Sequence, residues 1–204
     1  MSDALRGGRG QLRDDAAQKE SYDARARIAQ KLHAWHVSSV PVEAALVNCQ
    51  PLTANLVRFF YLGTFNQNLD LAQARLTITA ASAGSTVRTG LYIYDTTVDR
   101  RLVLVAPSAA LFSGAATGAL TYNLGTLVTL SAGSRVFLGV KPSDNVVGVA
   151  GADFSTYART LPYFTLAHVA GVLPPIVQRA AMTENSTGYI LAATYLNKEA
   201  LDVF

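Results

Sequence analysis

From Pro41 onward, apolar side chains alternate with other side chains at a period of two, and this alternation restricts the fold more than any other feature of the sequence. The clearest cases are Val87, Thr89, Leu91 and Ile93 alternating with Arg88, Gly90, Tyr92 and Tyr94, and Val136, Leu138 and Val140 alternating with Arg135, Phe137, Gly139 and Lys141. Successive residues of a strand point to opposite faces. Each segment therefore has one aliphatic face for a core and one mixed face.

Short β-branched and aromatic segments, separated by Gly, Ser, Asn and Asp, continue to the end of the chain. The predicted strands are Leu56–Leu62, Ala74–Ala80, Thr86–Tyr94, Leu102–Ala106, Ala119–Asn123, Leu127–Leu130, Arg135–Lys141, Val146–Ala150, Tyr163–Ala167 and Tyr189–Tyr195. Turns are predicted at Ala83–Ser85, Ser131–Ser134 and Ser143–Asn145. This pattern predicts a mainly β fold, an antiparallel β-sandwich or jelly roll.

The N-terminal segment has a different composition. Residues 1–36 hold 12 of the 31 charged residues, and Gly7, Gly8 and Gly10 among arginines predict an extended tether. Good helix formers follow, so a helix is expected from Asp14 or Asp15 to about His36. We therefore expect two parts, an N-terminal tether and α-helix over 1–40 and a β domain over 41–204.

One face of this predicted helix carries Ile28, Leu32 and Trp35, which are the candidate residues for docking on a partner. Two occupants of that face are consistent with the spacing, namely the adjacent β domain and another subunit. Ser21 and Lys31 would lie in a coiled-coil seam, which argues against a long coiled coil.

Composition excludes several classes of protein. The net charge is +3 without a basic run, which argues against nucleic-acid binding. The single cysteine, Cys49, rules out an internal disulfide framework and is expected to be a small buried residue. No secretory signal and no apolar run of membrane-spanning length is present, so we expect no membrane partner and synthesis in a cytoplasm.

No catalytic or metal-ligating pattern is recognisable. His33 and His36 are three residues apart, but the nearby candidate ligands are Glu20 and Asp23, a few turns back. His168 lies in an apolar stretch, and the sequence contains no Gly-x-Ser-x-Gly elbow that would supply the serine of a Ser-His-Asp triad. His168 is therefore expected to be an edge histidine with its hydrogen bonds satisfied. We therefore predict no enzyme activity, no metal and no cofactor.

The remaining polar candidates are interpreted as turn residues. The acidic side chains Asp95, Asp99, Asp144 and Asp153 are expected to cap their own backbone in turns. Asn185 fits a glycosylation acceptor pattern, but it too is expected in a turn.

Two stretches carry a resemblance. LTITAASAGSTVRTGLYIYD (Leu76–Asp95) and SGAATGALTYNLGTLVTLSAGSRVFLGVKPSD (Ser113–Asp144) resemble a β-sandwich module of tailed-bacteriophage tail fibres, baseplate appendages and other virion surface proteins. The resemblance covers Thr53 to about Ala150. It implies a virion location, other virion structural proteins as partners, a homotrimer, and attachment through the N-terminal arm. A head decoration, cement or head-fibre protein on the capsid is the alternative position.

Tyr92 and Tyr94 lie on the mixed face of their strand, where they are candidates for contact with a glycan or with another subunit. A glycan contact would make the protein a carbohydrate-binding module for host cell-surface polysaccharide. Residues 37–204 contain only 19 charged residues. This low charge favours a homo-oligomer, because subunit interfaces are depleted in charge.

Overall fold

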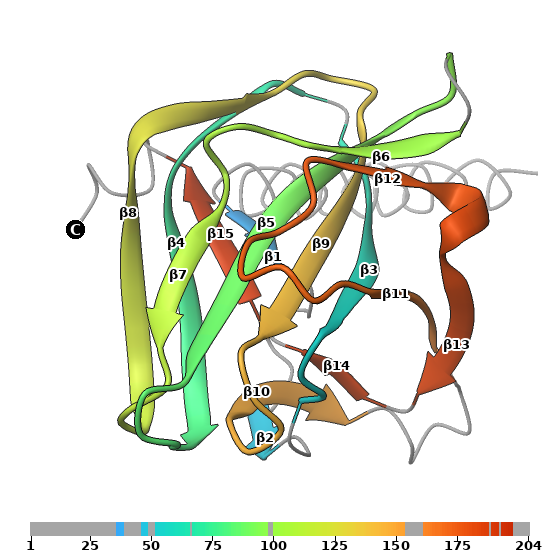
Figure 1. Cartoon of the computed structure of the whole chain (residues 1–204). Coiled ribbons are helices and arrows are strands. Elements are labelled where there is room, and N and C mark those ends of the chain that lie inside the picture. The colour runs from blue at the N-terminus through green and yellow to red at the C-terminus, as the bar shows by residue number, and fades with distance from the viewer. Residues whose placement is uncertain are drawn as a thin grey trace, which may run out of the picture. The chain divides into compact units, whose positions relative to one another are not determined.

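The computed structural model describes residues 36–38, 46–48, 52–65, 67–97, 100–153, 161–187, 189–191 and 193–197 (Figure 1). All of them belong to one compact unit, His36–Phe204. The predicted helix before His36, its candidate docking residues Ile28, Leu32 and Trp35, and Cys49 lie outside the described residues.

The described residues form a mainly β fold of two antiparallel sheets. The first is seven-stranded, with the order β1-β15-β4-β10-β14, with β8 paired to β4 and β2 paired to β10. Its strands are β1 (His36–Ser38), β2 (Leu46–Asn48), β4 (Leu69–Ala80), β8 (Gly118–Leu130), β10 (Gly148–Asp153), β14 (Tyr189–Leu191) and β15 (Ala193–Asn197).

The second sheet is eight-stranded, with the order β12-β6-β5-β9-β3-β11-β13 and β7 paired to β5. Its strands are β3 (Leu56–Thr64), β5 (Thr86–Asp95), β6 (Arg101–Leu104), β7 (Ala110–Ser113), β9 (Arg135–Pro142), β11 (Leu161–Ala167), β12 (Ile176–Gln178) and β13 (Thr183–Thr187). A single short 3₁₀ turn, η2 (Arg179–Ala181), is the only helical element among the described residues.

Most predicted strands are confirmed, with differences that have local causes. The two strands expected at 119–123 and 127–130 are one strand, β8, in which residues 124–127 form a bulge opposite β4. Gly125 accommodates this bulge at φ +77°, a conformation that glycine adopts without strain. The predicted turns at Gly84 and Gly133 are confirmed, and both glycines have positive φ.

The sheet also begins earlier than expected. β1 includes His36, which the sequence placed at the end of a helix and in the N-terminal arm. Pairing of β1 with β15 brings residues 36–38 into the seven-stranded sheet. A three-residue strand has too little alternation to be recognised in the sequence, and the same is true of β2 and β12.

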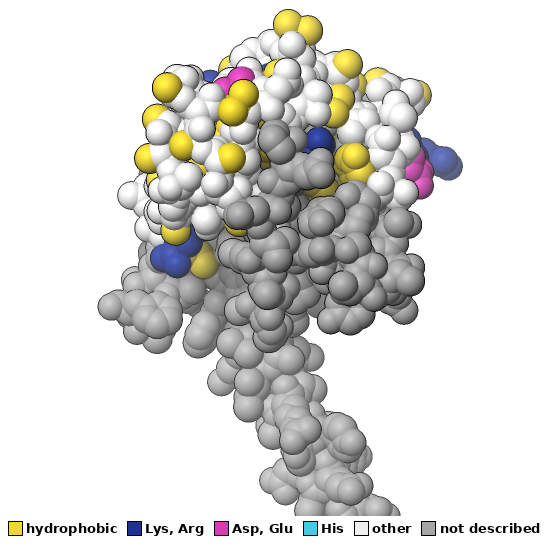
Figure 2. Space-filling view, turned by 90° about the horizontal axis from the view of Figure 1, so that it is seen from below, with side chains coloured by type: hydrophobic (Ala, Val, Ile, Leu, Met, Phe, Trp, Pro, Cys, Tyr) yellow, Lys and Arg dark blue, Asp and Glu magenta, His cyan; other side chains and the backbone are white. Residues whose placement is uncertain are grey.

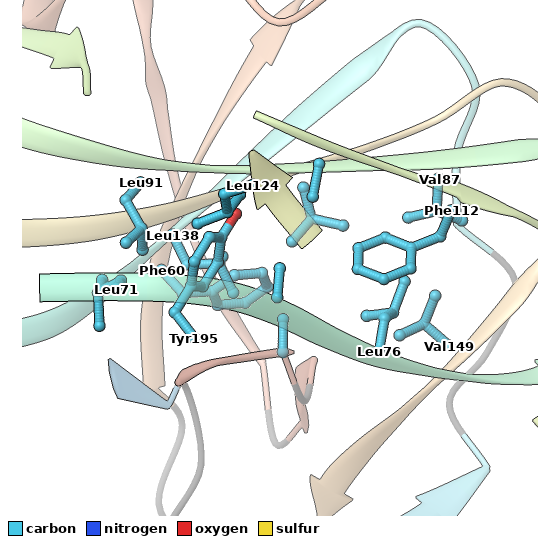
Figure 3. Packing of buried hydrophobic residues seen from close by; sticks show 14 of the residues in the cluster. Phe60, Leu71, Leu76, Val87, Leu91, Phe112, Leu124, Leu138, Val149 and Tyr195 are labelled. Atoms are coloured by element: carbon cyan, nitrogen blue, oxygen red, sulfur yellow. The ribbon is translucent and has the colours of Figure 1, made fainter. Parts of the chain in front are cut away.

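The first core lies between the two sheets (Figure 3). It receives the aliphatic face of the central strands, including Val87 and Leu91 from β5 and Leu138 from β9, all of them fully buried. Leu71 and Leu76 of β4 approach from the seven-stranded sheet. The predicted inward face of both alternating strands is therefore confirmed.

A polar contact crosses this core. The hydroxyl of Tyr195, on β15, donates to the Ser108 carbonyl oxygen at 2.9 Å and accepts from Thr89 Oγ1, on β5, at 3.0 Å. Ser108 Oγ in turn accepts from the Leu91 amide and donates to the Leu91 carbonyl. Burial raises the pKa of the Tyr195 hydroxyl well above its usual value, so it remains a donor. This contact links the two sheets.

A second core lies on the opposite face of the eight-stranded sheet. Its fully or nearly fully buried members are Val57, Phe59, Tyr92, Leu102, Leu173, Val177 and Met182. The edge strands β12 and β13 are joined by only four residues, through η2, although they lie at opposite ends of the strand order. The sheet is therefore curled, and the mixed face expected from the sequence is largely buried.

Two glycines make room on this curled face. Gly90 and Gly139 are directly paired across β5 and β9. A Cβ at Gly139 would lie 2.5 Å from Tyr92 Cε2 and 3.3 Å from Phe59 Cε1, and one at Gly90 would lie 2.7 Å from a methyl of Leu173. The rings and the Leu173 side chain therefore occupy the space that larger residues would take.

Replacing Gly139 by alanine tests this close packing. We expect Gly139→Ala to lower the free energy of unfolding by about 1–3 kcal/mol, because the buried rings must shift. Gly171→Ala is the matched control, since a Cβ there meets nothing within 4 Å, and it should change stability by less than about 0.5 kcal/mol. Chemical denaturation measures both, and equal stabilities would contradict the packing argument.

Candidate binding surface

The structure places the predicted polar residues in structural roles. His168 Nε2 donates to the Val172 carbonyl at 3.0 Å, as expected for a satisfied edge histidine. Asp95 Oδ1 accepts from the Thr97 amide, and Asp144 Oδ1 accepts from the amides of Val146 and Val147. The turn roles of these two aspartates are confirmed, and their hydrogen bonds lower the pKa of both carboxyls.

Asn185 differs from its expectation. It lies within β13 and not in a turn, and its Nδ2 donates to Thr165 Oγ1 on the neighbouring strand β11 at 2.8 Å. Asp99 and the side chains of Asp153 and His36 lie outside the described part of the structure.

Tyr92, one of the two candidate contact tyrosines, is fully buried in the second core. Its hydroxyl donates to the Pro174 carbonyl at 2.9 Å, and its ring packs edge-to-face on Phe59 with a centroid distance of 5.1 Å. Burial raises the pKa of this hydroxyl above its usual range. The expectation of a ligand or subunit contact at Tyr92 is corrected, because the ring is not accessible.

Tyr94 is only half-buried, and it is part of a group of partly exposed rings that we call the aromatic surface. Its members are Tyr61, Tyr94, Phe137 and Phe164, which come from β3, β5, β9 and β11. Phe137 is the central ring, with centroids 5.1 Å from Tyr61 and 6.2 Å from both Tyr94 and Phe164. Tyr61 is the most exposed, at 52%.

Polar and charged groups adjoin the aromatic surface. The Arg179 guanidinium lies 4.3 Å from the centroid of Phe164 and bonds to Glu184 at 3.2 Å. Tyr61 and Thr64 share a hydrogen bond between their hydroxyls at 3.1 Å. Rings bordered by a carboxylate, a guanidinium group and hydroxyls can stack on the flat apolar face of a ligand. The bordering groups can then form hydrogen bonds with the polar substituents of that ligand.

Sequence reasoning found Tyr94 but missed the other three rings of the aromatic surface. Phe137 lies on the mixed face of its strand, and Tyr61 is its direct partner across β3 and β9. These two strands are more than seventy residues apart in the chain, so their pairing has no local sequence signal. Periodicity identified the face, whereas the sheet order determines which rings meet.

Within the described part of the chain, no group of three or more His, Cys, Asp or Glu side chains is placed to hold a metal ion. No described helix has the length and apolar character needed to cross a membrane. Comparison with known proteins found no matching family model and no matching curated protein.

Tyr92 and Tyr61 differ in exposure, so removing their rings should lower the free energy of unfolding by different amounts. Tyr92→Ala should destabilise the protein by about 3–5 kcal/mol, because it empties a buried aromatic site. Tyr61→Ala removes a half-exposed ring and should cost about 1 kcal/mol or less. Urea unfolding of the two variants measures the difference. Similar losses would show that the aromatic surface is part of the core.

Proposed function

We propose that the protein is a structural subunit of a tailed-bacteriophage virion, a tail-fibre or baseplate appendage that attaches through its N-terminal arm, before His36, and projects its β domain. The observation that carries this proposal is the position of the resembling stretches. Leu76–Asp95 and Ser113–Asp144 include the whole of β5, β8 and β9 and the end of β4. These strands come from both sheets, so the resemblance concerns the scaffold of a sandwich or jelly roll.

The distribution of charge supports a homo-oligomer, which we propose to be a trimer. The face in Figure 2 shows few charged side chains and many scattered hydrophobic ones over its described part. Exposed apolar residues include Leu111, Leu127, Val146 and Ile176. Surfaces that are poor in charge and carry exposed aliphatic groups suit contact between subunits.

A position on the capsid, as a decoration, cement or head-fibre protein, remains the alternative within this class. The scaffold would be the same in either place.

Carbohydrate binding is a second candidate function, and the aromatic surface favours it. Four rings on four neighbouring strands, with the Arg179–Glu184 ion pair beside Phe164, match the chemistry that recognises the apolar faces and hydroxyls of sugar rings. The ligand class would be a host cell-surface glycan. This function is compatible with a place in a virion appendage.

The attachment role is tested by deleting Met1–Asp14 from the chain. We expect the truncated protein to keep the fold and melting temperature of the β domain but to lose incorporation into particles, since the described strands begin at residue 36. Circular dichroism and particle composition measure the two effects. A chain whose residues 2–14 are replaced by a Gly/Ser sequence of equal length separates length from sequence. Unfolding on truncation would contradict the proposed division of the chain.

The glycan role is tested separately with Tyr61→Ala and Tyr94→Ala. If the aromatic surface binds host glycan, both variants should fold and assemble normally and reduce adsorption to host cells by about five- to tenfold, since loss of one stacked ring removes about 1–1.5 kcal/mol. Val169→Ala, which replaces an 80% exposed side chain outside the aromatic surface, is the control. Loss of assembly with intact protomer folding would instead assign the rings to a subunit contact.

A further inference from the structure

Two cationic side chains face each other on the curled sheet. Arg88 of β5 and Lys141 of β9 are direct partners in the antiparallel register, so both side chains project from the same face. Lys141 is only 5% exposed, and Arg88 is half-buried. On its other side, Arg88 is paired with the apolar residue Leu111 of β7.

Neither cation is neutralised within the described residues. The ion pairs among the described residues are Arg101 with Asp95 and Arg179 with Glu184. Neither of them involves Arg88 or Lys141. Asp144, three residues after Lys141, uses one carboxylate oxygen on two backbone amides and the other on the Ser82 hydroxyl. Its oxygens are therefore already bonded elsewhere.

This arrangement is unfavourable as it stands. Like charges at directly opposed positions of a sheet repel, and burial adds a desolvation cost. Burial and the charge of Arg88 both lower the pKa of the Lys141 ammonium. Lys141 is almost fully buried, and its ammonium is near enough to the charge of Arg88 to be repelled by it.

The ammonium itself stays within reach of solvent. In the described part of the chain, the fully enclosed side-chain polar atoms that lack a hydrogen bond are Gln73 Oε1 and Thr79 Oγ1. The Lys141 nitrogen is not among them although it makes no hydrogen bond there, so it is not fully enclosed by the described residues.

We propose that Arg88 and Lys141 form a binding site for an oxyanion, a phosphate or carboxylate group that bridges the guanidinium and the ammonium. A guanidinium offers two parallel N–H donors to such a group, and the ammonium contributes a further charged donor. An anion bound between the guanidinium and the ammonium would replace the repulsion between two cations with two attractive ion pairs. The anion comes either from solution, as a free phosphate, or from an acidic side chain of a second copy of this chain. The site does not depend on the proposed virion role.

The test uses the full chain and inorganic phosphate. Melting temperatures are measured with sodium phosphate and with sodium chloride at matched ionic strength, for the wild type, Lys141→Met and Arg88→Gln. A free-anion site predicts a saturable rise in the wild type, of about 5–10 °C at a phosphate concentration one hundred times Kd, which both variants lose. Arg135→Met removes an exposed cation from the same strand, β9, and should respond like the wild type.

The second source gives a different result. If a carboxylate of another copy fills the site, phosphate leaves the wild-type melting temperature unchanged, whereas Lys141→Met and Arg88→Gln reduce the mass of the assembly in light scattering and Arg135→Met does not. If Lys141→Met fails to fold, the phosphate response and the assembly mass of Arg88→Gln provide the test. The proposal is overturned if phosphate has no specific effect on the wild type and the charge variants keep the wild-type mass.

Discussion

The eight-stranded sheet has to bury both of its faces, and the rest of the described structure depends on this constraint. Its inner face packs on the seven-stranded sheet through the first core, and its other face curls around the second. The curled face needs room for buried side chains, and Gly90 and Gly139, which are directly paired, leave that room because they have no side chains of their own. The ring of Tyr92 and the side chain of Leu173 occupy the space over these two glycines. The segment from His168 to Met182 is thereby held across the sheet, with Tyr92 bonded to Pro174.

Polar contacts define how the two sheets align. Apolar side chains in a core contribute free energy but accept many relative positions, whereas a buried hydroxyl needs its partners at fixed distances. Tyr195 meets this need by joining β15 to Thr89 of β5 and to the Ser108 carbonyl. Ser108 also binds both the amide and the carbonyl of Leu91, so one network connects both sheets and the loop between β6 and β7.

How much of this the sequence could predict depends on the range of each interaction. The alternation at 86–94 and 135–141 is local, and it correctly predicted the strands and the side chains that face the first core. Tyr92 was assigned to the correct face but with the wrong environment, because its cover comes from Leu173 and Pro174, some eighty residues later. Sheet order likewise decides which rings join Tyr94. The short strands β1 and β12 gain their hydrogen bonds only from distant partners, and so they carry no periodic signal of their own.

The same constraint explains why the aromatic surface is suited to contact with a partner. Its four rings project from neighbouring strands of one sheet, and Tyr92 and Phe59, packed against each other in the second core, are deeply buried in the same face of that sheet. Rings on paired strands lose less freedom on binding than rings on loops, so more of the contact energy remains as affinity. Burial of the curled face is incomplete where Tyr61, Tyr94, Phe137 and Phe164 lie. At that point the second core reaches solvent, and its aromatic side chains become a surface.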